Sequence, residues 1–211
     1  MEARDGAWGA GEHPGSARAS TMRAALGYWS LLAAAWWAAF NLRPAVVGIA
    51  PVMPLIRSDL GLSYLETGII LSMPVVVMGL GSLPGSSLVA RLGAVRVVSY
   101  GLLLVAAGSL ARAASTGFGS LLVTTAVLAG GVGLAQPALP VLVKQRYPAH
   151  MGLATSIYTS GLIIGATAGA FATAPLLLPW MGPWSWRGTL LFWGGLTLLA
   201  WLGWGVINRR A

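Results

Sequence analysis

Arg43 is the residue whose chemistry stands out, because this cation lies inside an apolar stretch that runs from about residue 24 to residue 56. A guanidinium stays protonated at any accessible pH. Placing one at the centre of a bilayer costs between ~2.5 and ~17 kcal/mol, depending on the reference state. Such a residue usually faces a water-filled cavity, so Arg43 is a candidate for binding a small anion or a nitro group. The alternative is that Arg43 pairs with helix carbonyls as a structural element.

Two aromatic residues share the helical face of Arg43. Trp36 and Phe40 precede it at spacings that bring side chains to one side of a helix. Their rings can form an apolar wall beside the cation, and we include both in the predicted substrate site. Packing on a neighbouring helix is the alternative for each ring.

Gln136 and Tyr158 are polar residues in other apolar stretches, and each can donate a hydrogen bond to an anion. They complete the predicted substrate site. The alternative for both is a hydrogen bond between helices, which contributes about 1–2 kcal/mol in a membrane. Lys144 is expected to be an interfacial anchor, since long cationic side chains extend towards the headgroups.

Enzymatic chemistry is not expected. The chain has no cysteine, and its five carboxylates are predicted to lie in an amino-terminal tail or at the outer rim of the membrane. No zinc-protease, nucleophile-elbow or phosphate-loop motif is present. We therefore expect no enzyme, no cofactor and no metal. If transport is coupled to protons, the titrating group must come from outside this sequence.

The elements that position these residues are predicted to be membrane-spanning helices. The chain is 56% hydrophobic and only 9% charged, with a mean hydropathy of +0.76. A soluble domain carries about 25% charged residues. Apolar stretches of helix-spanning length predict an all-α polytopic membrane protein with six transmembrane helices. They lie at about 26–55, 65–89, 95–113, 119–143, 152–178 and 188–207.

The positive-inside rule predicts the orientation. With the amino terminus in the cytoplasm, the inside set is Arg4, Arg18, Arg23, Arg91, Arg96, Lys144, Arg146, Arg209 and Arg210, and the outside set is Arg57, Arg112 and Arg187. Both termini are then cytoplasmic, with 209–211 as the cytoplasmic end, and we expect the inner membrane. Although the net charge is +8, the basic residues form no continuous patch, so no nucleic acid partner is expected.

Residues 1–23 are predicted to form a disordered cytoplasmic tail before a transmembrane domain at 24–208. Met22 is an alternative start. A cleaved signal peptide is the competing interpretation, but the apolar stretch continues past Arg43, well beyond an ordinary signal sequence.

Proline and glycine patterns bear on the architecture. Pro51 and Pro54 at the end of the first span resemble Pro137 and Pro140 at the end of the fourth, which suggests an inverted 3+3 repeat. The fifth span carries small residues on one face, at the spacing that lets helix backbones approach closely, namely Gly161, Gly165 and Gly169.

Several motifs together resemble the cyanate and 2-nitroimidazole transporter branch of the major facilitator superfamily. They are Asn41-Leu42-Arg43-Pro44, the stretches 71–75, 139–144 and 152–159, Trp186-Arg187-Gly188, and Phe192-Trp193. The resemblance covers about residues 27–207. It implies a secondary transporter in which the first, second, fourth and fifth spans line a central cavity.

The resemblance also implies a gating loop between the second and third spans. Arg91 and Gly93 match it, but Ala90 stands where the family has an aspartate, so its charge relay is incomplete here. Family members have two six-helix halves, and this sequence resembles the amino-terminal one. We therefore expect either a second half or self-association.

The predicted function is secondary transport of a small anion or a nitro or polar organic solute, such as a cyanate-like substrate, by alternating access. The predicted partners are that solute, the lipid bilayer and the second half. The alternative is a six-helix channel or a non-transporting membrane scaffold.

Overall fold

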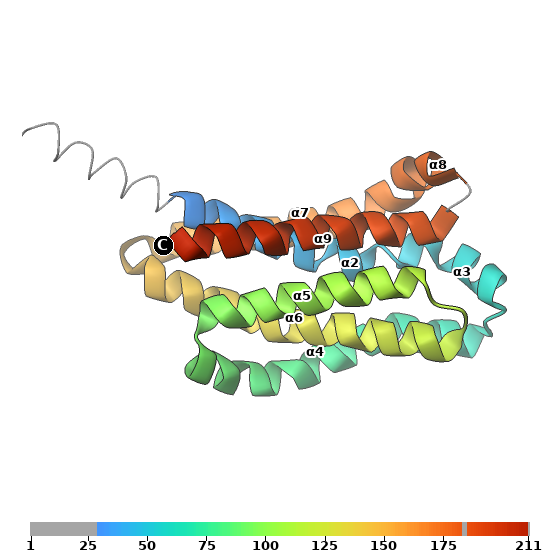
Figure 1. Cartoon of the computed structure of the whole chain (residues 1–211), viewed down its shortest axis with the longest axis horizontal. Helices are drawn as coiled ribbons and strands as arrows, with labels where there is room; N and C mark the ends of the chain where they lie inside the picture. The colour runs from blue at the N-terminus through green and yellow to red at the C-terminus, as the bar shows by residue number, and fades with distance from the viewer. Residues whose placement is uncertain (1–28, 183–184, 211) are drawn as a thin grey trace, which may run out of the picture.

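The computed structural model describes residues 29–182 and 185–210, so the predicted tail at 1–23 lies outside the described part. Every regular element within these ranges is a helix. Six helical segments are long and apolar enough to cross a membrane, as the fold-class prediction required. They lie side by side along the long axis of the molecule (Figure 1).

Two of the six segments are built from several shorter pieces. The first runs Trp29–Leu60 and contains α2 (Pro44–Val47), a 3-10 turn at Ala50–Val52 and α3 (Met53–Leu60). The fifth contains a 3-10 turn at Pro148–His150, α7 (Met151–Ala172), a π-helical turn at Thr173–Leu177 and α8 (Leu178–Met181). The continuous ones are α4 (Tyr64–Leu92), α5 (Ala94–Ala113), α6 (Phe118–Arg146) and α9 (Ser185–Arg210).

Local sequence fixes where α4 begins and ends. Gly61 ends α3 with a left-handed φ of 64°, and Ser63 and Glu66 then form a capping box. The Ser63 hydroxyl accepts from the Glu66 N–H at 3.2 Å, and the Glu66 carboxylate accepts from the Ser63 N–H at 2.8 Å. At the other end Gly93, with a φ of 82°, separates α4 from α5.

The core lies around α5 and α6, which pack against each other, with α9 on the other side of α5 and α4 on the other side of α6. Glycine makes these approaches close. A Cβ on Gly108 of α5 would lie 2.7 Å from the Leu128 nitrogen of α6, and one on Gly133 would lie 2.9 Å from the Met78 oxygen of α4. Side chains of ordinary size would force these helices apart.

The glycine stripe on α7 packs against the first span, as the spacing predicted. A Cβ on Gly161 would lie 2.6 Å from the Trp36 carbonyl oxygen, and one on Gly165 would overlap the Phe40 carbonyl oxygen. The Phe40 carbonyl lacks its usual helical donor, because Pro44 has no N–H. The stripe therefore lets α7 lie directly on the interrupted backbone of the first span.

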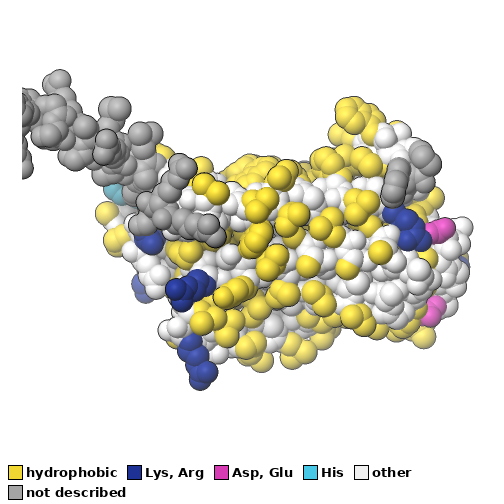
Figure 2. Space-filling model, in the orientation of Figure 1, with side chains coloured by type: hydrophobic (Ala, Val, Ile, Leu, Met, Phe, Trp, Pro, Cys, Tyr) yellow, Lys and Arg dark blue, Asp and Glu magenta, His cyan; other side chains and the backbone are white. Residues whose placement is uncertain are grey.

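Charged side chains gather at the two ends of the bundle. Figure 2 shows several Lys and Arg side chains at one end, the acidic side chains together with basic ones at the other, and apolar surface between the two ends. The basic end holds Arg91, Arg96, Lys144 and Arg146, all exposed. At the acidic end Arg187 and Asp59 form an ion pair of 3.1 Å. This is the charge distribution of a multi-pass membrane protein.

Candidate functional site

A pocket of about 620 Å³ opens between α4, α6 and α7. Its lining combines apolar side chains with a few hydroxyl and amide groups, and no lining residue carries a charge. The lining residues are Met78, Gly79, Ser82, Gly133, Gln136, Pro137, Pro140, Tyr158, Thr159 and Leu162. Predominantly apolar pockets with a few well-placed polar groups are typical of small-solute sites.

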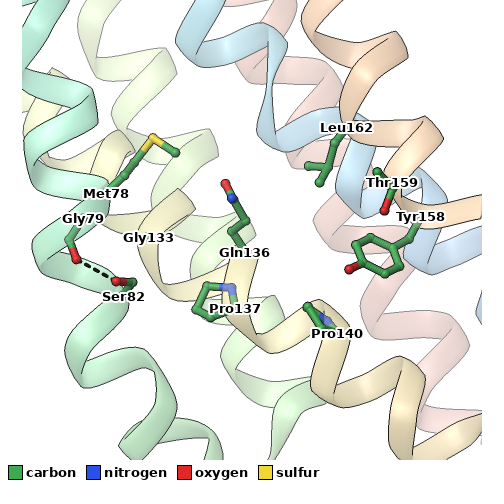
Figure 3. A pocket seen from close by; sticks show the side chains of 10 residues that line it. All are labelled: Met78, Gly79, Ser82, Gly133, Gln136, Pro137, Pro140, Tyr158, Thr159 and Leu162. Atoms are coloured by element: carbon green, nitrogen blue, oxygen red, sulfur yellow. Dashed lines mark hydrogen bonds between the residues drawn. The ribbon is translucent and has the colours of Figure 1, made fainter. Parts of the chain in front are cut away.

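Gln136 contributes an amide from α6, immediately before Pro137. Figure 3 shows this amide pointing into the space between Met78 of α4 and Leu162 of α7. Its Oε1 atom is buried and has no hydrogen-bond partner among the described residues. A buried amide left without a partner is costly, so Gln136 is available for a solute or for water.

Tyr158 contributes a phenol from the opposite wall. Its side chain is only 8% exposed, and its ring packs in the core with Ala154. The hydroxyl makes no hydrogen bond within the described parts of the chain, and Figure 3 shows it turned towards the prolines of α6. The structure thus brings two predicted site residues, Gln136 and Tyr158, to one pocket.

Sequence reasoning missed most of the α4 and α7 lining. Met78, Ser82, Thr159 and Leu162 were not predicted as site residues. Ser82 donates to the Gly79 carbonyl at 2.7 Å, which leaves its hydroxyl oxygen able to accept. The α6 contribution carried a usable signal, because its pocket residues follow a single helical face, at Gly133, Gln136, Pro137 and Pro140.

Arg43 lies where the first span breaks, just before α2, and it does not line this pocket. Its side chain is partly exposed. Its guanidinium makes no hydrogen bond or ion pair with any described residue. The alternative of Arg43 pairing with helix carbonyls is therefore not what the structure contains. Its role in anion binding stays a prediction.

Trp36 and Phe40 also lie outside the pocket lining. Their rings stack with centroids 5.7 Å apart, and Trp37 stacks on both. The Trp36 indole donates to the Ser160 hydroxyl of α7 at 3.1 Å. The structure thus places Trp36 at the contact with α7, in agreement with the packing alternative.

The gating-loop residues lie at the basic end. Arg91 is exposed in the last turn of α4, and Gly93 provides the left-handed residue before α5. No ion pair involving Arg91 occurs within the described ranges. Lys144 is exposed near the end of α6, a position that suits an interfacial anchor.

Arg112 was counted in the outside set of cations, at the end of the third predicted span. The structure places it in the last turn of α5, where its relative exposure is 0%. Its Nε donates to the Thr125 hydroxyl of α6, and its Nη1 donates to the Ala45 carbonyl of the first span, both at 2.9 Å. The positive-inside rule does not predict the burial of Arg112, because it counts cations by their position along the chain.

The sequence matches known proteins over almost its full length. A model of the Major Facilitator Superfamily matches residues 24–210. The chain is 35% identical over 167 residues to the uncharacterized transporter YycB of Bacillus subtilis (strain 168). It is 31% identical over 173 residues to the cyanate transport protein CynX, and 31% over 174 residues to the 2-nitroimidazole transporter, both of Escherichia coli (strain K12).

These alignments cover 79%, 81% and 82% of this chain but only 40%, 44% and 43% of the three relatives. The chain thus spans less than half the length of each. Since the family model includes all six membrane-length helices, the chain belongs to the major facilitator superfamily.

Proposed function

We propose that this chain forms one six-helix lobe of a secondary transporter that moves a small anionic or polar solute by alternating access. The pocket between α4, α6 and α7 is the observation that carries the proposal. It places the side chains of Gln136 and Tyr158, for which the described residues offer no hydrogen-bond partner, around a volume of about 620 Å³, enough for a small solute. Family membership supports membrane transport and a non-enzymatic function.

The relatives suggest the solute class. Their names specify cyanate and 2-nitroimidazole, two small molecules that present hydrogen-bond acceptors. The Gln136 amide N–H groups and the Tyr158 hydroxyl can donate to such acceptors. Arg43 supplies a positive charge from the neighbouring first span, and its fork of donors suits a carboxylate-like or nitro group.

The charge distribution supports an orientation. The exposed cations Arg91, Arg96, Lys144 and Arg146 lie at one end of the bundle, which we assign to the cytoplasm. Both termini are then cytoplasmic, and the inner membrane of a bacterial cell is the proposed location.

A second six-helix half, or a second copy of this chain, completes the proposed pathway. The chain spans 40% to 44% of the three relatives. The spans that contain α4 and α7 are also the least buried of the six. In the most apolar stretch of each span, 17% of the residues are buried for α4 and 22% for the span of α7. Because the pocket opens between these two helices, a partner packed there would close it.

Uptake of labelled cyanate and of 2-nitroimidazole by cells that express the chain with a candidate second half tests the proposal. We expect saturable uptake that falls about tenfold in the double variant Gln136→Leu, Tyr158→Phe, because two polar contacts are lost. The matched control is Gln145→Leu, Tyr100→Phe, whose residues are exposed and lie outside the pocket. Uptake that rises linearly with solute concentration would favour the channel alternative.

A further inference from the structure

Arg112 is the most unusual buried group in the described structure. Its guanidinium is fully buried, yet no carboxylate pairs with it, since the ion pair found among the described residues joins Arg187 and Asp59. Two of its nitrogens donate to Thr125 and Ala45, while Nη2 has no partner among the described residues. A buried charge with incomplete hydrogen bonding is expensive to maintain, so its position calls for a reason beyond core stability.

The Ala45 carbonyl that Arg112 binds lies at the break in the first span. α2 ends at Val47, and the backbone hydrogen bonds that follow it do not include one from Ile49 to Ala45. Pro51 then removes a further donor, because it has no N–H. An unpaired carbonyl at membrane depth costs about 1–3 kcal/mol or more, so an outside donor is needed to keep this segment broken.

The same break is held from other sides as well. A Cβ on Gly48 would lie 3.1 Å from both the Thr173 hydroxyl and the Trp193 indole nitrogen. The Trp193 indole itself donates to Thr173 at 3.0 Å. These contacts fill space around Gly48, but only Arg112 donates a side-chain hydrogen bond to the Ala45 carbonyl among the described residues.

We propose that Arg112 is a positioning residue for Arg43: by holding the Ala45 carbonyl, it keeps the first span broken and fixes the direction in which Arg43 points. Arg43 lies only two residues before Ala45, and its carbonyl accepts from the Val47 N–H at 3.0 Å, so the short helix α2 links Arg43 directly to the carbonyl that Arg112 holds. The statement that Arg43 then meets a solute rests on the proposed function. The statement that Arg112 restrains the segment around Ala45 does not.

The chain contains no cysteine, so a thiol reagent modifies this protein only at a cysteine that is introduced by substitution. We would place a thiol at Arg43→Cys, and reference thiols at Ser82→Cys and Thr159→Cys in the pocket wall. The membrane-embedded chain is then treated with 2-(trimethylammonium)ethyl methanethiosulfonate, and the modification rate is measured with Arg112 intact and in the Arg112→Met background.

Loss of the Ala45 hydrogen bond is expected to raise the rate at position 43 by about fivefold or more, because the segment loses its restraint. The rates at positions 82 and 159 should stay within about twofold, since their helices do not contact Arg112 through a hydrogen bond. Should Arg112→Met fail to accumulate in the membrane, Arg112→Gln replaces it, because that side chain is too short to reach both acceptors.

Thr125→Val supplies the control for a merely structural role. It removes one Arg112 hydrogen bond and leaves the bond to Ala45, so it should lower stability without changing the rate at position 43 by more than about twofold. An unchanged rate at 43 without Arg112, an equal rise at all three thiols, or an equal rise at 43 in Thr125→Val would each overturn the proposal. Because no solute is involved, these outcomes are independent of the transport assay.

Discussion

Two arginines in apolar surroundings take opposite positions in this molecule. Arg43 is partly exposed, and its guanidinium has no partner among the described residues. Arg112 is fully buried and donates to a main-chain carbonyl, the role that sequence reasoning had offered as the alternative for Arg43. The partly exposed guanidinium of Arg43 is therefore the one that could bind a solute, whereas the hydrogen bonds of Arg112 hold two neighbouring segments together.

Arg43→Gln is expected to reduce anion uptake by about tenfold to a hundredfold, because a hydrogen bond to a charged group contributes about 1.5–3 kcal/mol. Membrane insertion should be unchanged. The measurement is uptake of labelled cyanate in cells with matched membrane levels of each variant. Arg96→Gln, at an exposed cation on α5, is the control. Full uptake by Arg43→Gln would assign this residue to structure.

Tyr158→Phe is expected to weaken solute binding by about threefold to tenfold and to leave thermal stability nearly unchanged. The hydroxyl makes no hydrogen bond within the described residues, so its removal breaks no internal contact. Equilibrium binding to the purified chain and its unfolding temperature test both statements. A large loss of stability would show that the hydroxyl has a structural partner.

Solute binding to this pocket is expected to be constant between about pH 5.5 and pH 8.5. None of the lining residues is an aspartate, glutamate, lysine, arginine or histidine. Titration of binding at several pH values tests this. A clear step in affinity would mean that a group outside the lining contributes to the site.

At the scale of elements, two of the membrane-length segments are interrupted within the described residues. The first span breaks at Pro44 and again near Pro51, and the fifth contains a π-helical turn with Pro175. These interruptions are tolerated because neighbouring side chains and close glycine contacts satisfy or cover the freed backbone groups. Gly165 is the tightest of these contacts, since it lies against the Phe40 carbonyl oxygen.

Gly165→Ala is therefore expected to destabilise the chain by about 1–3 kcal/mol, the usual range for overpacking. Gly195→Ala on α9 is the matched control, because a Cβ there meets nothing within 4 Å. It should be neutral or stabilising by up to about 1 kcal/mol. Thermal unfolding in detergent compares the two, and equal behaviour would show that α7 and the first span separate without cost.

At the scale of the whole molecule, the chain is an open lobe. The pocket lies between α4 and α7, the two helices whose apolar side chains are most exposed, and the exposed set includes Val75, Leu80 and Phe171. The described carboxylates near the membrane are both engaged at one end, Asp59 with Arg187 and Glu66 with Ser63. Neither is placed to carry a proton through this lobe.

The purified chain reconstituted by itself is expected to show little saturable transport, because the proposed pathway needs a second wall from another half. Addition of a six-helix second half should restore it. Uptake into proteoliposomes, with and without that partner, makes the comparison. Robust transport by the chain alone would show that self-association supplies the second wall.

Much of the fold could be predicted from the sequence. Helices of membrane-spanning length follow from long apolar stretches, because a bilayer leaves backbone groups no partner outside the helix. The glycine stripe on α7 and the uneven charge at the two ends also followed from spacing and composition. So did Gln136 and Tyr158 as pocket candidates, since polar groups in apolar stretches need a local partner.

The tertiary structure decided which face of each helix meets which neighbour. It thereby decided which arginines are buried and which are exposed. Arg112 looks in the sequence like an outside cation at the end of the third span, but the packing of α5 against α6 and the first span buries it against the Ala45 carbonyl. Pairing of this kind joins residues far apart in the chain, as Arg112 and Ala45 are, and depends on helix rotation. Hydropathy and charge counts follow position along the chain and contain no information about rotation.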